Sequence, residues 1–344
     1  MITIKQNFSL LNYNTFHLDV KTKRFVEYES VEDLRNFLSE NNLRQCSSSS
    51  VTSFLHVGSG SNLLFNGDYP GTVLHSKIKF TKVLERDENY ITVKLGSGII
   101  WDDFVIYAVS QGWYGAENLS LIPGEVGACA IQNIGAYGVE IKDLVKELDV
   151  IDLDGNEKVY TNADCDYGYR DSIFKRAECK DRIVTAVTLR LGLKKNFSLS
   201  YGRLKEQIVK RFGPMISLSA VRDSVITLRM SKLPDPKFIG NAGSFFMNPV
   251  ISRIKFTDIQ KTYSDVPFYE IDEESVKIPA AWLIETCGWK GKTVGHAGVY
   301  EEQALILVNR GGAVGSEIIE LAYAIVDSVE KKFSIKLRME VNII

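Results

Sequence analysis

The segment 240–249, with the sequence GNAGSFFMNP, constrains the fold more than any other part of this chain. Glycines at 240 and 243 allow backbone angles and close approaches that a side chain would forbid, and the pair Phe245 and Phe246 is costly to leave in water. The segment therefore predicts a tight turn that enters a buried or half-buried strand and holds Ser244 in a fixed position. Taken alone, such a segment is more often a simple bend before a core strand.

Length and composition indicate a soluble globular enzyme with two or three compact units. The chain has 344 residues, of which 45% are hydrophobic and 24% charged, and this size exceeds what one ordinary core needs. A net charge of −2 gives no general attraction to nucleic acid or anionic membranes, so we expect no nucleic-acid partner. Residues 1–8 lack the features of an export signal, and no apolar run is long enough to span a bilayer.

Cysteine and histidine usage argue against disulfides and metals. The five cysteines are scattered without CxxC spacing, which favours a reducing, cytoplasmic location. The four histidines show no HExxH or paired-ligand spacing, so we expect no metal site. These residues are Cys46, Cys129, Cys165, Cys179 and Cys287, and His17, His56, His75 and His296.

Hydrophobic periodicity predicts intermixed helices and strands, which indicates an α+β fold. A capping pattern at Ser30 and Asp33 predicts the start of a first helix. The other expected helices cover 101–109, run from Pro279 to Gly288, and start near Ser316. The expected strands are 54–57, 91–95, a hairpin over 148–161, 183–191 and a terminal strand 337–344.

Two glycine-rich segments have the character of ligand-binding loops. In the first, residues 58–62 (GSGSN), backbone N–H groups in a nest-like turn could hold a pyrophosphate, although a plain tight turn fits equally well. The second, residues 115–138, is rich in glycine and alanine and interrupted by Asn118, Gln132 and Asn133. Such a stretch lets backbone lie against a flat ligand, as an isoalloxazine ring would require. A crossover packed against a sheet is the alternative.

Several separated motifs together resemble the UDP-N-acetylenolpyruvoylglucosamine reductase family, flavoenzymes that complete UDP-N-acetylmuramate in peptidoglycan synthesis. The resemblance covers essentially the whole chain. The motifs, in the family's order, are YNTF at 13–16, residues 57–65, residues 115–140, YGYRDSIFK at 167–175, the GNAGSFFMNP segment and the tail containing Glu340.

The resemblance implies a fold, a cofactor and a substrate. It implies an FAD domain of the vanillyl-alcohol-oxidase (PCMH) type over residues 1–197, with lobes of about 1–78 and 79–197, and a substrate-binding domain over 198–344. The last strand, 337–344, is expected to pack back on the second lobe. The implied ligands are non-covalent FAD, NADPH as co-substrate and UDP-N-acetylglucosamine enolpyruvate. We expect a monomer.

The resemblance also implies roles for individual residues. Ser244 matches the proton donor, Arg170 the arginine that stabilises an enolate, and Glu340 the acidic residue opposite. Each has a simpler structural explanation: a turn serine, an arginine paired with Asp171, and a solvated terminal glutamate. The implied FAD contacts are Gly58, Ser59, Gly60, Ser61, Asn62, Leu63, Pro123, Gly124, Gly127, Gln132, Asn133, Gly135, Ala136, Tyr137, Gly138 and Ile183. The implied substrate contacts are Tyr169, Tyr201, Lys232, Asn248 and Gln303.

Three departures from the family pattern leave these groups in place. Ser59 stands where glycine is common, Met339 where we expect a proline, and Met247 where a basic residue is frequent. Two other readings also stay open. One is a flavin oxidase that tethers its cofactor through His56 or His75. The other is a non-catalytic protein that binds a nucleotide sugar or a flavin.

Overall fold

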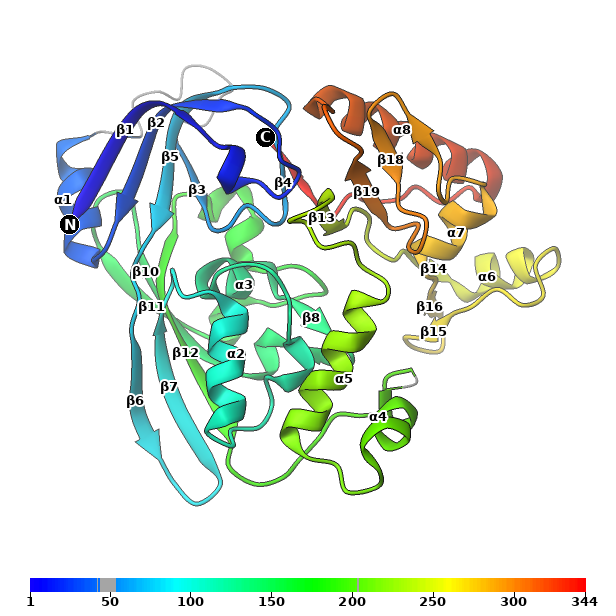
Figure 1. Cartoon of the computed structure of the whole chain (residues 1–344), viewed down its shortest axis with the longest axis horizontal. Helices are drawn as coiled ribbons and strands as arrows, with labels where there is room; N and C mark the ends of the chain where they lie inside the picture. Colours follow the sequence, from blue (N-terminus) through cyan, green and yellow to red (C-terminus); the bar gives the residue numbers. More distant parts are fainter. Residues whose placement is uncertain (42, 44–53, 203) are drawn as a thin grey trace. The chain divides into compact units, whose positions relative to one another are not determined.

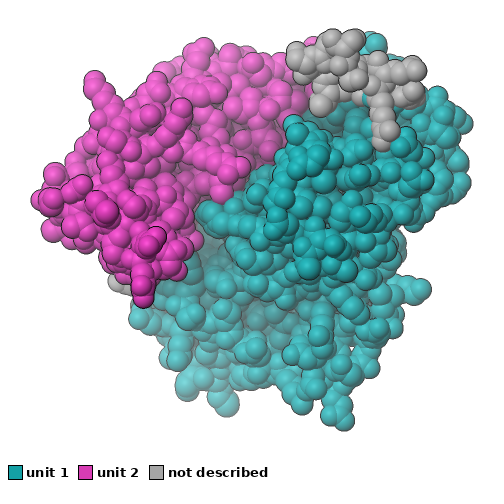
Figure 2. Space-filling model, turned by 180° about the vertical axis from the view of Figure 1, so that it is seen from behind, with its two compact units in different colours: residues 1–8, 22–59, 70–231 teal, residues 9–21, 60–69, 232–344 magenta. Residues whose placement is uncertain are grey.

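The computed structural model describes residues 1–41, 43, 54–202 and 204–344, which form two compact units. Unit 1 comprises residues 1–8, 22–59 and 70–231, and unit 2 comprises residues 9–21, 60–69 and 232–344; Figure 2 colours them separately. Cys46 lies outside the described residues. Of the domain predicted for 198–344, residues 198–202 and 204–231 belong to unit 1 in this division.

Unit 1 is built on two antiparallel or mixed sheets, which Figure 1 shows in blue to green. A four-stranded sheet has the order β1-β2-β5-β3, and a five-stranded sheet has the order β11-β10-β12-β7-β6. The strands are β1 (Ile2–Ser9), β2 (Lys21–Tyr28), β3 (Phe54–Val57), β5 (Tyr69–Ser76), β6 (Thr81–Arg86), β7 (Tyr90–Gly96), β10 (Val145–Ile151), β11 (Glu157–Thr161) and β12 (Ile183–Gly192).

Helices cover these sheets and close the cores of unit 1. Helix α1 (Val31–Glu40) buries Leu34, Phe37 and Leu38 against the first sheet, and Ser30 caps it by accepting a hydrogen bond from Asp33 N at 3.0 Å. Helices α2 (Trp101–Ser110) and α3 (Val126–Gln132) share one core with the five-stranded sheet. Helices α4 (Leu204–Phe212) and α5 (Leu218–Met230) form a smaller cluster.

Unit 2 contains the four-stranded sheet β13-β19-β18-β17, with α8 packed on β18 and β19. A three-stranded sheet, β14-β16-β15, and a parallel pair, β20-β4, complete it. The elements are β4 (Leu63–Leu64), β13 (Gly240–Ser244), β14 (Val250–Ser252), α6 (Arg253–Gln260), β15 (Tyr269–Glu270), β16 (Ser275–Lys277), α7 (Ala280–Thr286), β17 (Thr293–Val294), β18 (Ala297–Val299), β19 (Ile306–Asn309), α8 (Gly315–Phe333) and β20 (Asn342–Ile343).

The expected elements at 30–40, 54–57, 91–95, 101–109, 148–161, 183–191 and 316 onward are confirmed. Three expectations were wrong in detail. Pro279 is the residue before α7 rather than part of its first turn, although Gly288 (φ 75°) does end that helix. The GNAGS glycines lie inside β13, and Phe245 and Phe246 follow the strand. The terminal strand covers only Asn342–Ile343, and it pairs with β4.

One ion pair ties α5 to α2 within unit 1, and we expect it to contribute to stability. The Arg222 guanidinium binds both carboxylate oxygens of Asp102, at 2.7 and 2.9 Å, and Leu121 N donates to the same carboxylate. The Arg222 and Asp102 side chains are only 11% and 20% exposed. Burial alone would raise the pKa of Asp102, but Arg222 and the Leu121 amide hold it below its ordinary value.

Asp102→Asn should therefore lower the free energy of unfolding by about 3 kcal/mol at pH 7, because it leaves a buried guanidinium without its charge partner. Since the folded-state pKa is depressed, this contribution is present above the ordinary aspartate pKa of about 3.9 and is lost as the pH falls through the folded value. Urea unfolding at pH 7 and at pH 3 measures both effects. Asp258→Asn, at an exposed pair with Lys261, is the control and should change nothing measurable.

Candidate active site

In unit 1, the first glycine turn packs against the start of α3 in the second glycine-rich segment. A Cβ placed on Gly58 would lie 3.2 Å from Ala128 Cβ and 3.3 Å from Glu125 Oε2. The Ser59 hydroxyl lies 3.4 Å from Glu125 Oε1. Ser59, which stands where the resemblance leads us to expect glycine, thus has a local partner. The structure brings these two predicted flavin-binding segments together.

Helix α3 itself lies close to the five-stranded sheet. A Cβ on Gly127 would lie 2.8 Å from Ser97 Cβ, so only glycine allows this approach. Gly124 O accepts a hydrogen bond from Trp101 N at 3.0 Å. Pro123 precedes Gly124 in the loop before α3, and Ile183 is the buried first residue of β12. Segment 115–138 therefore packs on a sheet, as the crossover alternative predicted, and this packing is also compatible with a ligand-binding loop.

After α3 the chain makes a tight hairpin that presents Tyr137. Strands β8 (Gly135–Ala136) and β9 (Val139–Glu140) pair, and the two residues between them, Tyr137 (φ 49°) and Gly138 (φ 83°), both have positive φ. Two positive φ values are typical of a type I′ hairpin turn. A tyrosine rarely adopts this conformation, and such strain concentrates at functional sites. The Tyr137 ring packs edge-on against Tyr201, with centroids 6.1 Å apart.

Arg170 sits at the tip of a second tight turn in unit 1. Gly168 and Asp171 exchange backbone hydrogen bonds at 3.0 and 3.1 Å, which leaves Tyr169 and Arg170 at the tip, and Arg170 has a φ of 55°. Arg170 Nη2 donates to Gly135 O at 2.6 Å, and its guanidinium lies 5.4 Å from the Tyr169 ring centroid. The Arg170 side chain is therefore bound to strand β8, which a solvated surface arginine would not be.

Asn133 holds this turn in place. It is fully buried in the left-handed region (φ 46°), and its amide donates to Gly168 O at 2.7 Å and to Glu140 Oε2 at 3.1 Å. The neighbouring Gln132 accepts a hydrogen bond from Lys175 Nζ, which also binds Arg170 O. We predicted Asn133 and Gln132 as flavin contacts. Their side chains bond to the Arg170 region of the protein.

Sequence reasoning missed Arg229, near the end of α5. Its Nε is buried and has no hydrogen-bond partner among the described residues. Burial lowers its pKa, Tyr137 and Asp102 raise it, and the charge of Arg170 lowers it further. Arg170 and Arg229 are both positively charged and repel one another near Tyr137, so an anion bound at this place in unit 1 would be stabilised. The only signal in the sequence was a second arginine in this helix, three residues before Lys232.

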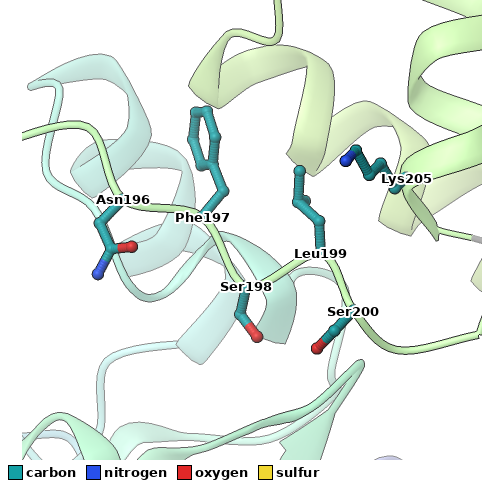
Figure 3. A pocket seen from close by; sticks show the side chains of 6 residues that line it. All are labelled: Asn196, Phe197, Ser198, Leu199, Ser200 and Lys205. Carbon is teal, nitrogen blue, oxygen red and sulfur yellow. The ribbon is translucent and has the colours of Figure 1, made fainter.

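The segment that leads to Tyr201 lines an open pocket of about 620 Å³. Figure 3 shows Phe197 and Leu199 pointing one way from an extended segment and Asn196, Ser198 and Ser200 the other. Phe197 and Leu199 pack on the α4 and α5 cluster, and Lys205 of α4 completes the lining. Tyr201 is 44% exposed, which suits a residue that contacts a ligand from the surface.

In unit 2, the other half of the first glycine turn meets the YNTF motif. A Cβ on Gly60 (φ 67°) would lie 1.9 Å from Tyr13 O, so no other residue fits there. Asn62 O accepts hydrogen bonds from the backbone and the amide of Asn342, and Leu63 begins β4. Gly60, Ser61, Asn62 and Leu63 are thereby tied to the chain's N-terminal and C-terminal segments.

A β-bulge positions Ser244 at the end of β13. Asn241 pairs with Val308 and Ser244 with Ile306, so the register shifts between them. Asn241 Oδ1 accepts a hydrogen bond from Gly243 N at 2.9 Å, and Gly243 has a φ of 69° with open space where a Cβ would point. Bulges re-aim side chains and are frequent beside active sites. Ser244 is half-buried at the end of this bulge.

The structure brings Glu340 next to this strand end. Glu340 N donates to Phe245 O at 2.8 Å, and Phe246 and Met339 form an isolated antiparallel β-bridge. Asn62 Nδ2 donates to Glu340 O at 3.3 Å. Methionine at position 339 therefore leaves the approach of the tail intact. Ser244, Glu340 and the second half of the glycine turn come together in unit 2, whereas Arg170, Tyr169 and Tyr201 belong to unit 1.

The remaining predicted substrate contacts lie in unit 2, where two of them bind backbone amides and one is exposed. Asn248 Oδ1 accepts from Ala280 N at 2.9 Å and so caps α7. Gln303 lies before β19, where its side chain accepts from Leu305 N at 3.3 Å. Lys232 is exposed, and it is the first residue of the range 232–344 in unit 2.

The residues present fit a flavin nucleotide. The two glycine segments meet in unit 1, and beside them the buried Asn118 Oδ1 has no hydrogen-bond partner in the described part of the chain. The Asn118 amide nitrogen donates to Tyr137 O and Ser198 O, which fixes its unused oxygen. Among the described residues, no group of three His, Cys, Asp or Glu side chains could hold a metal ion. No helix within those ranges combines the length and apolarity that a membrane crossing needs.

Family models match two parts of the chain. The model described as FAD binding domain matches residues 22–159, and the model described as the C-terminal domain of UDP-N-acetylenolpyruvoylglucosamine reductase matches residues 235–344. The chain is 50% identical to a UDP-N-acetylenolpyruvoylglucosamine reductase of Bacteroides fragilis over 99% of this chain and all of that protein. It is 45% identical to one of Porphyromonas gingivalis, over 99% of both chains.

Among solved structures, a UDP-N-acetylenolpyruvylglucosamine reductase from Thermus caldophilus is similar over 100% of this chain and 99% of its own, with a TM-score of 0.68 at 22% identity. That likeness supports the fold. The fold, the two glycine-rich segments and the family matches define an FAD-binding oxidoreductase with a separate C-terminal domain. The chain belongs to the UDP-N-acetylenolpyruvoylglucosamine reductase family, whose reaction serves cell-wall synthesis. This identification favours the reductase over both alternatives.

Proposed function

We propose that this protein uses NADPH to reduce the enolpyruvyl ether of UDP-N-acetylglucosamine to UDP-N-acetylmuramate, with Ser244 as proton donor. When bound and reduced by NADPH, FAD would supply the hydride for the terminal carbon of the enol ether. The observation that carries the proposal is the bulge of β13, which ends at Ser244 beside the backbone of Glu340.

Ser244 transfers its hydroxyl proton to the carbon next to the substrate carboxylate. A serine is a poor acid in water, but the enolate left by hydride addition is a strong base, so a neutral hydroxyl suffices. The half-buried position and the Asn241-fixed bulge hold the hydroxyl in one direction. A fixed donor lowers the entropic cost of the transfer.

Arg170 stabilises the charge that develops on the enolate. Its planar, permanently charged guanidinium is held by Gly135 O and by the turn that Asn133 anchors, so little reorganisation is needed as charge accumulates. Glu340 acts from the other side, where a protonated carboxyl would donate a hydrogen bond to the enolate. Arg229 adds positive charge near Arg170 and Tyr137.

The other predicted contacts then bind the cofactor and the UDP-sugar. The first glycine turn and segment 123–138 hold FAD without a covalent bond, while Tyr169, Tyr201, Lys232, Asn248 and Gln303 contact the substrate. Both ring nitrogens of His75 face carboxylates at 2.9 Å, and His56 Nε2 lies 2.7 Å from Tyr28 Oη, which disfavours a tether through either residue. We infer a cytoplasmic monomer.

Purification followed by acid precipitation tests the cofactor, and a steady-state assay tests the substrates. We expect FAD to be released completely into the supernatant, and kcat/KM with NADPH to exceed that with NADH. Formation of UDP-N-acetylmuramate, detected by mass spectrometry, establishes the reaction. Flavin retained in the pellet, or bound flavin without product, would contradict the proposal.

A further inference from the structure

A line of four charged side chains runs under the first glycine turn in unit 1. His75 on β5 is 5% exposed, and its Nδ1 lies 2.9 Å from Glu27 Oε1 of β2. Its Nε2 lies 2.9 Å from Glu125 Oε1, whose side chain is 8% exposed. Lys77 Nζ reaches Glu27 Oε1 at 3.2 Å. None of the four has a part in the reaction described above.

The geometry sets the charge of the imidazole. A neutral imidazole has one N–H, and an ionised carboxylate only accepts; with Glu27 and Glu125 ionised, both ring nitrogens at hydrogen-bond distance donate. An imidazolium satisfies both bonds and balances the charges: two carboxylates against Lys77 and His75. Buried charges persist only when they are paired in this way.

The groups that face this cluster agree with that assignment. Burial opposes ionisation of Glu27, yet hydrogen bonds from His75 and Lys77 hold its pKa below its ordinary value. On β3, burial and the neighbouring His75 lower the pKa of His56 to about 3, so His56 stays neutral. On α3, burial and Glu125 raise the pKa of the Cys129 thiol. The positive charge therefore resides on His75 and Lys77.

Glu125 connects this cluster to the predicted flavin site. Its Oε1 accepts from His75 and lies 3.4 Å from Ser59 Oγ, and its Oε2 lies 3.3 Å from the place that a Gly58 Cβ would take. Glu125 is also the residue directly before α3, so its position fixes the start of the second glycine segment. We propose that the His75 imidazolium is a positioning residue that locks the Glu125 carboxylate between the two glycine segments and so shapes them for FAD. This inference rests on the proposed binding of FAD.

Double-mutant analysis of FAD affinity tests the proposal. FAD is removed from the full-length protein, and its dissociation constant is measured by fluorescence quenching for wild type, His75→Gln, Glu125→Gln and the double variant. Each single variant should bind FAD at least tenfold more weakly, because each leaves the cluster with one unbalanced charge. The double variant should lose less than the product of the two single losses, because two neutral amides can pair.

His296→Gln is the matched control, since His296 binds Glu317 at 3.1 Å but is 62% exposed in unit 2. It should leave FAD affinity within twofold of wild type. Single variants at positions 75 and 125 that also stay within twofold would overturn the inference, as would losses that simply multiply in the double variant. A wild-type protein that binds no FAD would instead refute the proposed function.

The charge state has its own test that needs neither flavin nor a folded variant. Nitrogen NMR of wild-type protein carrying ¹⁵N-histidine should show both His75 ring nitrogens protonated at pH 7, in the apoprotein as in the holoprotein. One protonated and one bare nitrogen would overturn the assignment of His75 as an imidazolium, even if His75→Gln fails to fold.

Discussion

Replacing Ser244 by alanine is expected to leave flavin reduction by NADPH near the wild-type rate and to slow flavin reoxidation by substrate by about 10³-fold. Only the second half-reaction places a proton on carbon, and a positioned general acid contributes about 10² to 10⁴ in rate. The bulge at Asn241 and Gly243 does not depend on the serine hydroxyl, so the strand should keep its shape. Anaerobic single-turnover absorbance follows each half-reaction separately.

Two variants sharpen this result. Ser244→Cys retains a proton donor and should recover part of the lost reoxidation rate. Ser264→Ala removes an exposed serine hydroxyl elsewhere in unit 2 and should change neither half-reaction. Equal slowing of both half-reactions in Ser244→Ala would refute its role as proton donor.

Replacing Arg170 by glutamine is expected to slow reoxidation by about 10² to 10³-fold, comparable to the loss of one donor from an oxyanion-stabilising site. Glutamine can still donate to Gly135 O, but it carries no positive charge that would stabilise the enolate as it forms. Arg170→Lys keeps the charge and loses the planar pair of donors, so its rate should fall between wild type and glutamine. The same single-turnover traces measure all three proteins.

Arg176→Gln is the control for this series, because Arg176 lies nearby in the chain and pairs with Asp166 at the surface. It should behave as wild type. A normal reoxidation rate in Arg170→Gln, with only weaker substrate binding, would show that Arg170 holds the substrate without stabilising charge in the transition state.

Periodicity predicted most regular elements of this fold because their signals are local. The apolar stripe of α8, the hairpin of β10 and β11, and the Ser30 cap depend on residues a few positions apart. The resemblance indicated Ser244, Arg170 and Glu340, and the structure shows that Glu340 binds the backbone of Phe245, the residue after Ser244, in unit 2.

Long-range arrangements could not be read from the sequence. The pairing of β20 with β4 joins Leu63 to Asn342, far apart in the sequence, and no local pattern fixes such a partner. The amide of Asn133 anchors the Arg170 turn across 35 residues, whereas the composition of its segment predicts a ligand contact. The Glu27, His75 and Glu125 line comes from three separate elements, so only the folded chain reveals it.

The most direct test of the central claim is an anaerobic stopped-flow trace of the wild-type protein. It is reduced with NADPH and then mixed with UDP-N-acetylglucosamine enolpyruvate. We predict bleaching of the flavin band followed by its rapid recovery on addition of the substrate. Bleaching without recovery would contradict the proposed reaction, and a protein without flavin would contradict the assignment of both glycine segments.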